Sequence, residues 1–219
     1  MAAVSGTGIS LNSSFYLRNF YASNRDASSS SKRSNFGNNT LSQADASALH
    51  RAAKKLRTFN YEDDSSDGAN IYGCVSAYIE TYNNALNSAK NSSDASLNRY
   101  SKYLKNLSEK YAEEFEDIGV TVEKDGTLTA NDNLLKAADL ADVKKLFSKD
   151  SEYLNQSSRY ARRIQIKAEN AIFTEQSLAN KEAEENAADT NPIATALAAA
   201  ASTDTLLADG IGTNVNISL

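Results

Sequence analysis

The sequence has few of the residues that metal, redox and covalent chemistry require. Its 219 residues include one Cys, one His and no Trp. A disulfide within the chain needs two cysteines, and a structural zinc site needs several Cys or His ligands. The composition therefore excludes an internal disulfide and a zinc site, and it disfavours thiol-based redox chemistry. We expect no metal and no cofactor.

Long apolar runs and an excess of positive charge are also missing. The longest weakly polar stretch, 193–201, is much shorter than the roughly 20 apolar residues of a membrane-spanning helix. Residues 1–14 lack the basic start and apolar run of a secretory signal peptide. With 23 basic against 28 acidic residues, the net charge of −5 gives no reason to expect binding to a phosphate backbone. We expect neither a membrane nor nucleic acid as a partner.

The residues that could carry catalysis have simpler structural interpretations. His50 lies on the polar side of a predicted helix, with no Ser, Cys or carboxylate placed to form a relay. Cys74 lies beside an apolar stripe, where a small buried thiol is common. The acidic cluster in 109–117 lies largely opposite the apolar face of its helix, which indicates a solvated surface. Since no glycine-rich phosphate loop is visible either, the sequence indicates a protein that is not an enzyme.

Two acidic segments that contain glycine match calcium loops only in part. The twelfth position of an EF-hand loop, which requires a bidentate Glu, falls on Cys74 in one segment and on Asp132 in the other. Asp125 and Gly126 stand between β-forming residues and are better explained as the tight turn of a hairpin. We predict a β-hairpin near 119–130, followed by two short helices over 134–147, the second starting near Asp142.

Apolar residues recur at helical spacing over most of the remaining chain. Ser42 and Asp45 have the spacing of a capping box, which predicts a helix start at Ser42. The apolar stripes predict helices over 42–59, 71–89 and 97–118, and a helix of more than thirty residues from 151, whose stripe ends near 179 and whose last turns, 182–189, fray. The third of these has the clearest alternation of three-residue and four-residue steps.

Both ends of the chain have a composition typical of loosely ordered segments. Residues 1–41 are rich in Ser and Asn, and we predict a flexible arm. Its aromatic cluster, 15–21, leaves open a short helix that docks on this chain or on a partner. Residues 190–219 begin with an Ala-rich stretch and are predicted to form a semi-ordered tail.

The sequence thus predicts a mainly α fold, an antiparallel helical bundle or coiled coil with one small β-hairpin and disordered termini. Its predicted parts are the arm 1–41, the bundle 42–189 and the tail 190–219. The residues expected to serve packing or assembly are Tyr78, Tyr82, Leu97, Tyr100, Leu104, Leu107, Tyr111, Phe115, Leu146, Phe147 and Ile164, with Asp125 and Gly126 in the turn.

Two segments carry a family resemblance. The first is VSAYIETYNNAL (75–86), an apolar helix that ends in the aromatic-Asn pair Tyr82-Asn83. The second is IGVTVEKDGTLTANDNLLKAADLADVKKLF (118–147), in which Ile-Gly-Val and a strand precede Asp-Gly-Thr-Leu, a Leu-rich helix and Val-x-x-Leu-Phe. This order is similar to the carboxy-terminal signature of flagellar filament cap proteins, also called hook-associated protein type two. The resemblance covers a little under half of the chain and extends weakly to about Phe173.

The resemblance implies a helical stalk module of a protein that is exported through the flagellar channel and forms a ring at the filament tip, where it guides flagellin polymerisation. Only a short polar linker stands between 87 and 97, and the long first helix of the family's stalk is not evident. We expect a non-catalytic bacterial structural protein, extracellular on the flagellum, with a second copy of itself or flagellin as partner. The alternative is a cytoplasmic helical adaptor or export chaperone that binds a client helix in a groove.

Overall fold

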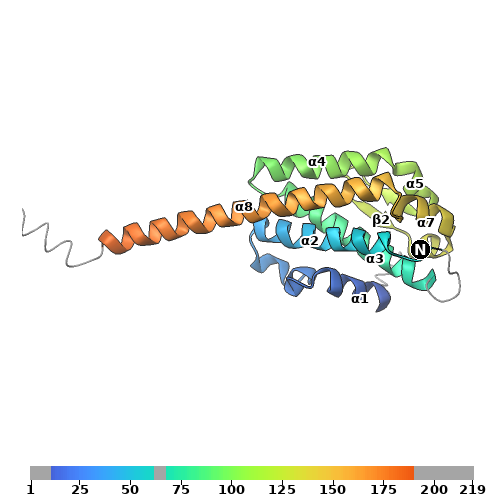
Figure 1. The fold of residues 1–219 in the computed structure, drawn as a ribbon, viewed down its shortest axis with the longest axis horizontal. Coiled ribbons are helices and arrows are strands. Elements are labelled where there is room, and N and C mark those ends of the chain that lie inside the picture. The colour runs from blue at the N-terminus through green and yellow to red at the C-terminus, as the bar shows by residue number, and fades with distance from the viewer. Residues whose placement is uncertain (1–10, 62–67, 190–219) are drawn as a thin grey trace, which may run out of the picture. The chain divides into compact units, whose positions relative to one another are not determined.

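The computed structural model describes residues 11–61 and 68–189 and shows a mainly helical protein with one antiparallel hairpin, as predicted. The elements in chain order are α1 (Leu11–Phe20), η1 (Arg25–Ser28), η2 (Arg33–Asn35), α2 (Asn38–Arg57), α3 (Gly68–Lys90), α4 (Ala95–Lys110), α5 (Ala112–Asp117), β1 (Val120–Val122), β2 (Leu128–Ala130), α6 (Asp132–Ala137), α7 (Leu140–Phe147) and α8 (Glu152–Asp189) (Figure 1). Among the described helices, none is long and apolar enough to cross a bilayer. The chain divides into two compact units, 1–172 and 173–219.

Helix α3 is the central element of the first unit. It packs against α1, α2, α4, β2 and α6, and Figure 1 shows α2, α3 and α4 running alongside one another. Its buried side chains include Val75, Tyr78, Ile79 and Tyr82, which lie on more than one face of the helix. A helix that is apolar around most of its circumference is stable only when neighbours cover it. The core of the first unit is therefore built around α3.

The predicted flexible arm is wrong for residues 11–41, which form α1, both 3-10 turns and the start of α2. Leu17, Phe20 and Tyr21 are buried, and α1 packs on α2 and α3. These three residues recur at steps of three and one along the chain, so they share one side of a helix and bury together. The alternative of a short helix that docks on this chain is what the structure shows. Residues 1–10 and the predicted tail 190–219 lie outside the described residues.

Helix α2 begins at Asn38, four residues before the predicted start. Ser42 is inside the helix, where its hydroxyl donates to the carbonyl oxygen of Asn38 at 2.8 Å. The carboxylate of Asp45 accepts hydrogen bonds from Arg33 and Tyr21 and caps no helix. The capping box was therefore a wrong interpretation, because a tertiary network uses the same carboxylate that the local motif would need.

The predicted third helix is divided at Tyr111 into α4 and α5. Asp94 caps α4 as its side chain accepts from the backbone nitrogens of Ser96 and Leu97 at 2.6 and 3.4 Å. At Tyr111 the backbone leaves helical geometry, with φ −108° and ψ 25°. Phe115 beyond the break is still fully buried, so the apolar periodicity visible in the sequence reports burial in both helices.

The hairpin has the predicted place and turn. β1 and β2 pair antiparallel with Val122 opposite Leu128, and Gly126 has φ +88° in the turn between them. A Cβ at Gly126 would lie 2.6 Å from Cγ and 3.0 Å from Cα of Lys105 on α4. Gly is needed there both for the positive φ and for the close approach of the turn to α4.

After the hairpin, Asn131 caps α6 and Asp139 caps α7, so α7 begins slightly before the expected start near Asp142. In α8 the side chains of Leu154, Ile164 and Ala168 are buried in the first unit. The described helical part of the second unit, 173–189, differs from the prediction, which continued the buried stripe to Leu178: Leu178 is 56% exposed.

Candidate functional site

The aromatic-Asn pair near the end of α3 holds the hairpin in place. The hydroxyl of Tyr82 lies 2.9 Å from the carbonyl oxygen of Leu104 and 3.2 Å from that of Gly126. Burial raises the pKa of Tyr82, so the hydroxyl keeps its proton and acts as a donor. One buried side chain thereby joins α3 to both α4 and the turn.

Asn83 makes a two-way contact with the hairpin backbone. Its Nδ2 donates to the carbonyl oxygen of Leu128, and its Oδ1 accepts from the Leu128 nitrogen, both at 2.8 Å. Glu123 and Thr127, and Gly119 and Asn131, are hydrogen-bonded across the hairpin. Because bonded and non-bonded pairs alternate in an antiparallel ladder, the backbone groups of Leu128 point away from β1. The amide of Asn83 satisfies both of them.

We expect Asn83→Ala to destabilise the protein by about 1–3 kcal/mol, because both half-buried backbone groups of Leu128 lose their partner. Chemical denaturation measures the effect, and amide exchange at Leu128 should rise more than exchange in α2. Asn87→Ala is the matched control, since Asn87 is an exposed Asn of the same helix. Equal stability of the two variants would show that the amide does not hold the hairpin.

A cluster of aromatic side chains forms the centre of the first unit. Tyr78, Phe115, Phe147 and Tyr153 are fully buried, and the Phe115 and Tyr153 rings meet edge-to-face with centroids 4.9 Å apart. The Tyr78 hydroxyl lies 3.1 Å from that of Tyr153 and 2.7 Å from Oγ of Ser157. Burial raises the pKa of Tyr78 to about 12. The phenols stay neutral and satisfy one another, as buried hydroxyls must.

The residues expected to serve packing or assembly occupy this core and its margins. The buried ones are Tyr78, Tyr82, Leu97, Leu104, Leu107, Phe115, Leu146, Phe147 and Ile164. Tyr100 and Tyr111 are half-buried against the core, and the Tyr111 hydroxyl donates to Glu152 at 2.9 Å. Asp125 is exposed in the turn and accepts from the Thr127 nitrogen, while Gly126 is buried. The buried side chains among them build the module, and a docking partner would meet other residues.

A groove between α2 and α8 is the most distinctive surface of the first unit, and the sequence did not reveal it. It has a volume of about 640 Å³. We call it the arginine groove; its lining residues are His50, Arg57, Asn155, Ser158, Arg159, Arg162, Arg163 and Ile166. Arg57 donates to Oδ1 of Asn155, and Nδ1 of His50 lies 3.0 Å from Oγ of Ser158, so polar pairs join the two helices.

The charged side chains that line the arginine groove are all arginines. Among the described residues, no Asp or Glu forms an ion pair with its four arginines, which are Arg57, Arg159, Arg162 and Arg163. Partial burial lowers the pKa of His50, and the charges of Arg162 and Arg57 lower it further. Guanidinium groups without a carboxylate partner in one groove create a positive potential that favours anions such as carboxylates.

The negative net charge of the whole chain gives no indication of this positively charged groove. Lys and Arg outnumber Asp and Glu by 22 to 17 over 11–61 and 68–172 taken together, with the excess in 11–61, whereas acidic residues outnumber basic ones by 11 to 1 over 62–67 and 173–219. A sum over the whole chain cancels these segments against one another. The signal that could have revealed a basic surface is the run Arg159, Arg162, Arg163 and Lys167 at helical spacing in α8.

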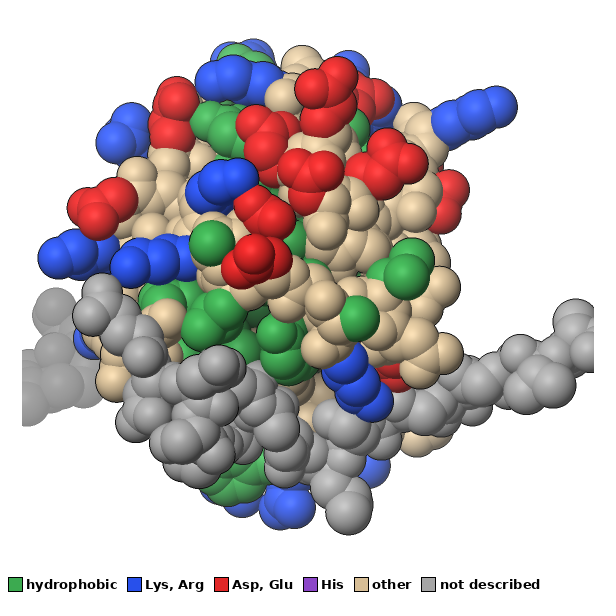
Figure 2. Space-filling view, turned by 90° about the vertical axis from the view of Figure 1, so that its right-hand side faces the viewer, with side chains coloured by type: hydrophobic (Ala, Val, Ile, Leu, Met, Phe, Trp, Pro, Cys, Tyr) green, Lys and Arg blue, Asp and Glu red, His purple; other side chains and the backbone are tan. Residues whose placement is uncertain are grey.

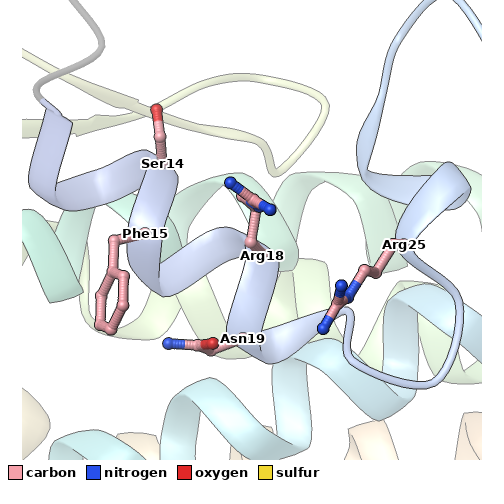
Figure 3. A pocket seen from close by; sticks show the side chains of 5 residues that line it. All are labelled: Ser14, Phe15, Arg18, Asn19 and Arg25. Atoms are coloured by element: carbon pink, nitrogen blue, oxygen red, sulfur yellow. The ribbon is translucent and has the colours of Figure 1, made fainter.

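A second hollow, of about 400 Å³, lies at α1. Figure 3 shows Ser14, Phe15, Arg18 and Asn19 on successive turns of α1, and Arg25 from the segment that follows. The Phe15 ring is 64% exposed and meets the Tyr16 ring edge-to-face with centroids 5.7 Å apart. Among the described residues that line this hollow, none is acidic, so they supply no pair of groups for acid-base chemistry.

The remaining candidates for reactive chemistry are structural. Burial raises the pKa of the Cys74 thiol to about 12, so at neutral pH it is protonated and a poor nucleophile. Among residues 11–61 and 68–189, no group of three or more His, Cys, Asp or Glu is placed to hold a metal ion.

Comparisons with protein-family models, curated proteins and solved structures find no match for this chain.

Proposed function

We propose that the protein is a non-catalytic structural component of the bacterial flagellum, similar to the stalk module of the filament cap and exported by the flagellar route. The observation that carries the proposal is the contact between the two segments that resemble the cap family. In the first segment, Asn83 makes both of its amide hydrogen bonds to Leu128 of the second. The Tyr82 hydroxyl lies 3.2 Å from the carbonyl oxygen of Gly126 in the second segment, besides its contact with Leu104.

The rest of the second segment supports the same proposal. Its residues Val120, Leu128, Leu135, Val143 and Phe147 are all buried in the core that α3 organises. The signature residues therefore act together as one packing unit, which is what a retained module requires. Gly119, within the Ile-Gly-Val triplet, has φ +74°, a conformation that favours Gly.

The location of the protein in its own host tests the proposal. An antibody against the chain would be applied to washed filaments, culture medium and cytoplasm, in strains with and without a working flagellar export apparatus. We expect the protein outside the cell, and only when the apparatus works. Retention in the cytoplasm of both strains would contradict export and reduce the resemblance to a shared helical architecture.

The arginine groove favours a second candidate function, a cytoplasmic adaptor or export chaperone. A groove between α2 and α8 lined with guanidinium groups suits an acidic client helix. Such a protein should stay inside the cell and co-purify with one client in a defined stoichiometry. Loss of the client from an Arg159→Glu/Arg162→Glu variant, with an unchanged circular dichroism spectrum, would support this candidate over the first.

A further inference from the structure

The positive charge of the arginine groove favours an anionic partner, and the same folded unit displays an acidic surface. Four of the six residues of α5 are acidic, and Glu113, Glu116 and Asp117 among them are exposed. Figure 2 shows acidic side chains gathered on the face of the molecule where α5 and α7 lie. We call these three residues the acidic face of α5. None of them lines the arginine groove, so the two surfaces are distinct.

The spacing of the charges matches between the two surfaces. Arg159 is three residues before Arg162 and four before Arg163, and Glu113 is likewise three before Glu116 and four before Asp117. At a rise of about 1.5 Å per residue, both sets place charges about one helical turn apart. Two helices laid side by side can therefore pair guanidinium and carboxylate groups in register, which is the strongest form of charged hydrogen bond.

We propose that the arginine groove of one copy of this chain binds the acidic face of α5 of a second copy. Because the two surfaces differ, the contact is head-to-tail, and repetition produces a ring if the rotation closes or an open row if it does not. Ile166, 39% exposed at the groove, supplies apolar contact beside the charges. The inference rests on the proposed function and deepens it by naming the two surfaces through which copies of the chain meet.

Sedimentation of the purified full chain tests the contact. We expect association that increases with protein concentration and weakens between about 50 and about 500 mM salt, since exposed charges are screened at high ionic strength. Arg159→Glu/Arg162→Glu reverses the charge of the groove, and Glu113→Arg/Glu116→Arg reverses the charge of the acidic face. Each should weaken association about tenfold or more, because like charges then meet across the interface.

Two controls make the assignment specific. Arg99→Glu/Lys102→Glu on α4 changes the same charge at the same spacing on exposed residues outside the groove, and it should associate like the wild type. An equal mixture of the two reversed variants should associate again, because each reversed surface then meets an opposite charge. Circular dichroism checks that all variants remain folded, which their exposed positions favour.

Three results would overturn the proposal. The wild-type chain could be monomeric at every concentration, or the mixture of the two reversed variants could fail to associate. In the third, reversing the charge of the groove weakens association while reversing the charge of the α5 face does not. The last would assign the groove to another acidic segment. None of them decides export, because a monomeric chain that reaches the medium through the flagellar apparatus would refute the interface and leave the proposed function standing.

Discussion

Leu104→Asp should abolish the folded state at neutral pH. Leu104 is fully buried on α4, where its backbone carbonyl also accepts from Tyr82. Removing the side chain alone costs about 2–5 kcal/mol, and burying an unpaired carboxylate adds several kcal/mol more. Together these approach the whole stability of an ordinary domain, about 5–15 kcal/mol. The loss of a cooperative thermal transition, followed by circular dichroism, is the expected observation.

The control is Asn106→Asp, which introduces the same side chain at an exposed position of the same helix. It should melt within a few degrees of the wild type. Leu104→Ala should stay folded with its unfolding free energy lowered by about 2–5 kcal/mol, which separates lost packing from buried charge. A Leu104→Asp protein that unfolds at the wild-type temperature would show that α4 does not belong to the core.

Asp45→Ala should lower the free energy of unfolding by about 3–5 kcal/mol, the usual effect of breaking a buried ion pair from one side. The Asp45 side chain is fully buried and accepts from both terminal nitrogens of Arg33, at 2.8 and 2.7 Å. It also accepts from the Tyr21 hydroxyl at 2.7 Å, and burial raises the pKa of Tyr21, which keeps that proton in place. The substitution removes this acceptor from both donors, and Arg33 keeps its hydrogen bond to the carbonyl oxygen of Ala27.

Asp26→Ala removes one partner of the exposed pair with Lys32, at 2.7 Å, and is the matched control. Exposed pairs contribute about 1 kcal/mol or less. Urea denaturation of both variants gives the comparison. If Asp45→Ala costs no more than Asp26→Ala, then the segment before α2 is not fastened to the bundle through this carboxylate.

The helices that could be predicted are those in which the buried residues recur along the sequence at helical spacing. The steps of three and four through Leu97, Leu104 and Phe115 repeat the pitch of a helix, and all three side chains are buried. The hairpin was predictable for a similar local reason, because Asp125-Gly126 supplies the backbone conformation that the turn needs. Local pattern is sufficient when one face of one element decides burial.

What local pattern missed depends on residues that are distant in sequence. Asp45 reads as a helix cap until Arg33 and Tyr21 are brought beside it. The ordered start of the chain was hidden by its Ser and Asn content, although Leu17, Phe20 and Tyr21 were the signal. The break at Tyr111 has no Gly or Pro to mark it.

The arginine groove shows the same limit at longer range. Arg57 and Arg159 stand about a hundred residues apart, and only the packing of α2 on α8 places them in one groove. No spacing in the sequence encodes that neighbourhood. The part of the groove that is local, the arginines of α8, carried a helical pattern that the net charge of the chain obscured.

The bidentate hold of Asn83 on Leu128 also affects how the protein can aggregate. The outer side of β2 would otherwise offer a free donor and acceptor to any extended peptide, and an exposed strand edge is a common starting point for cross-β association. A side-chain amide from a helix occupies that position, so no foreign strand can add to β2 there. The hairpin thus has a built-in guard against intermolecular sheet growth at this edge.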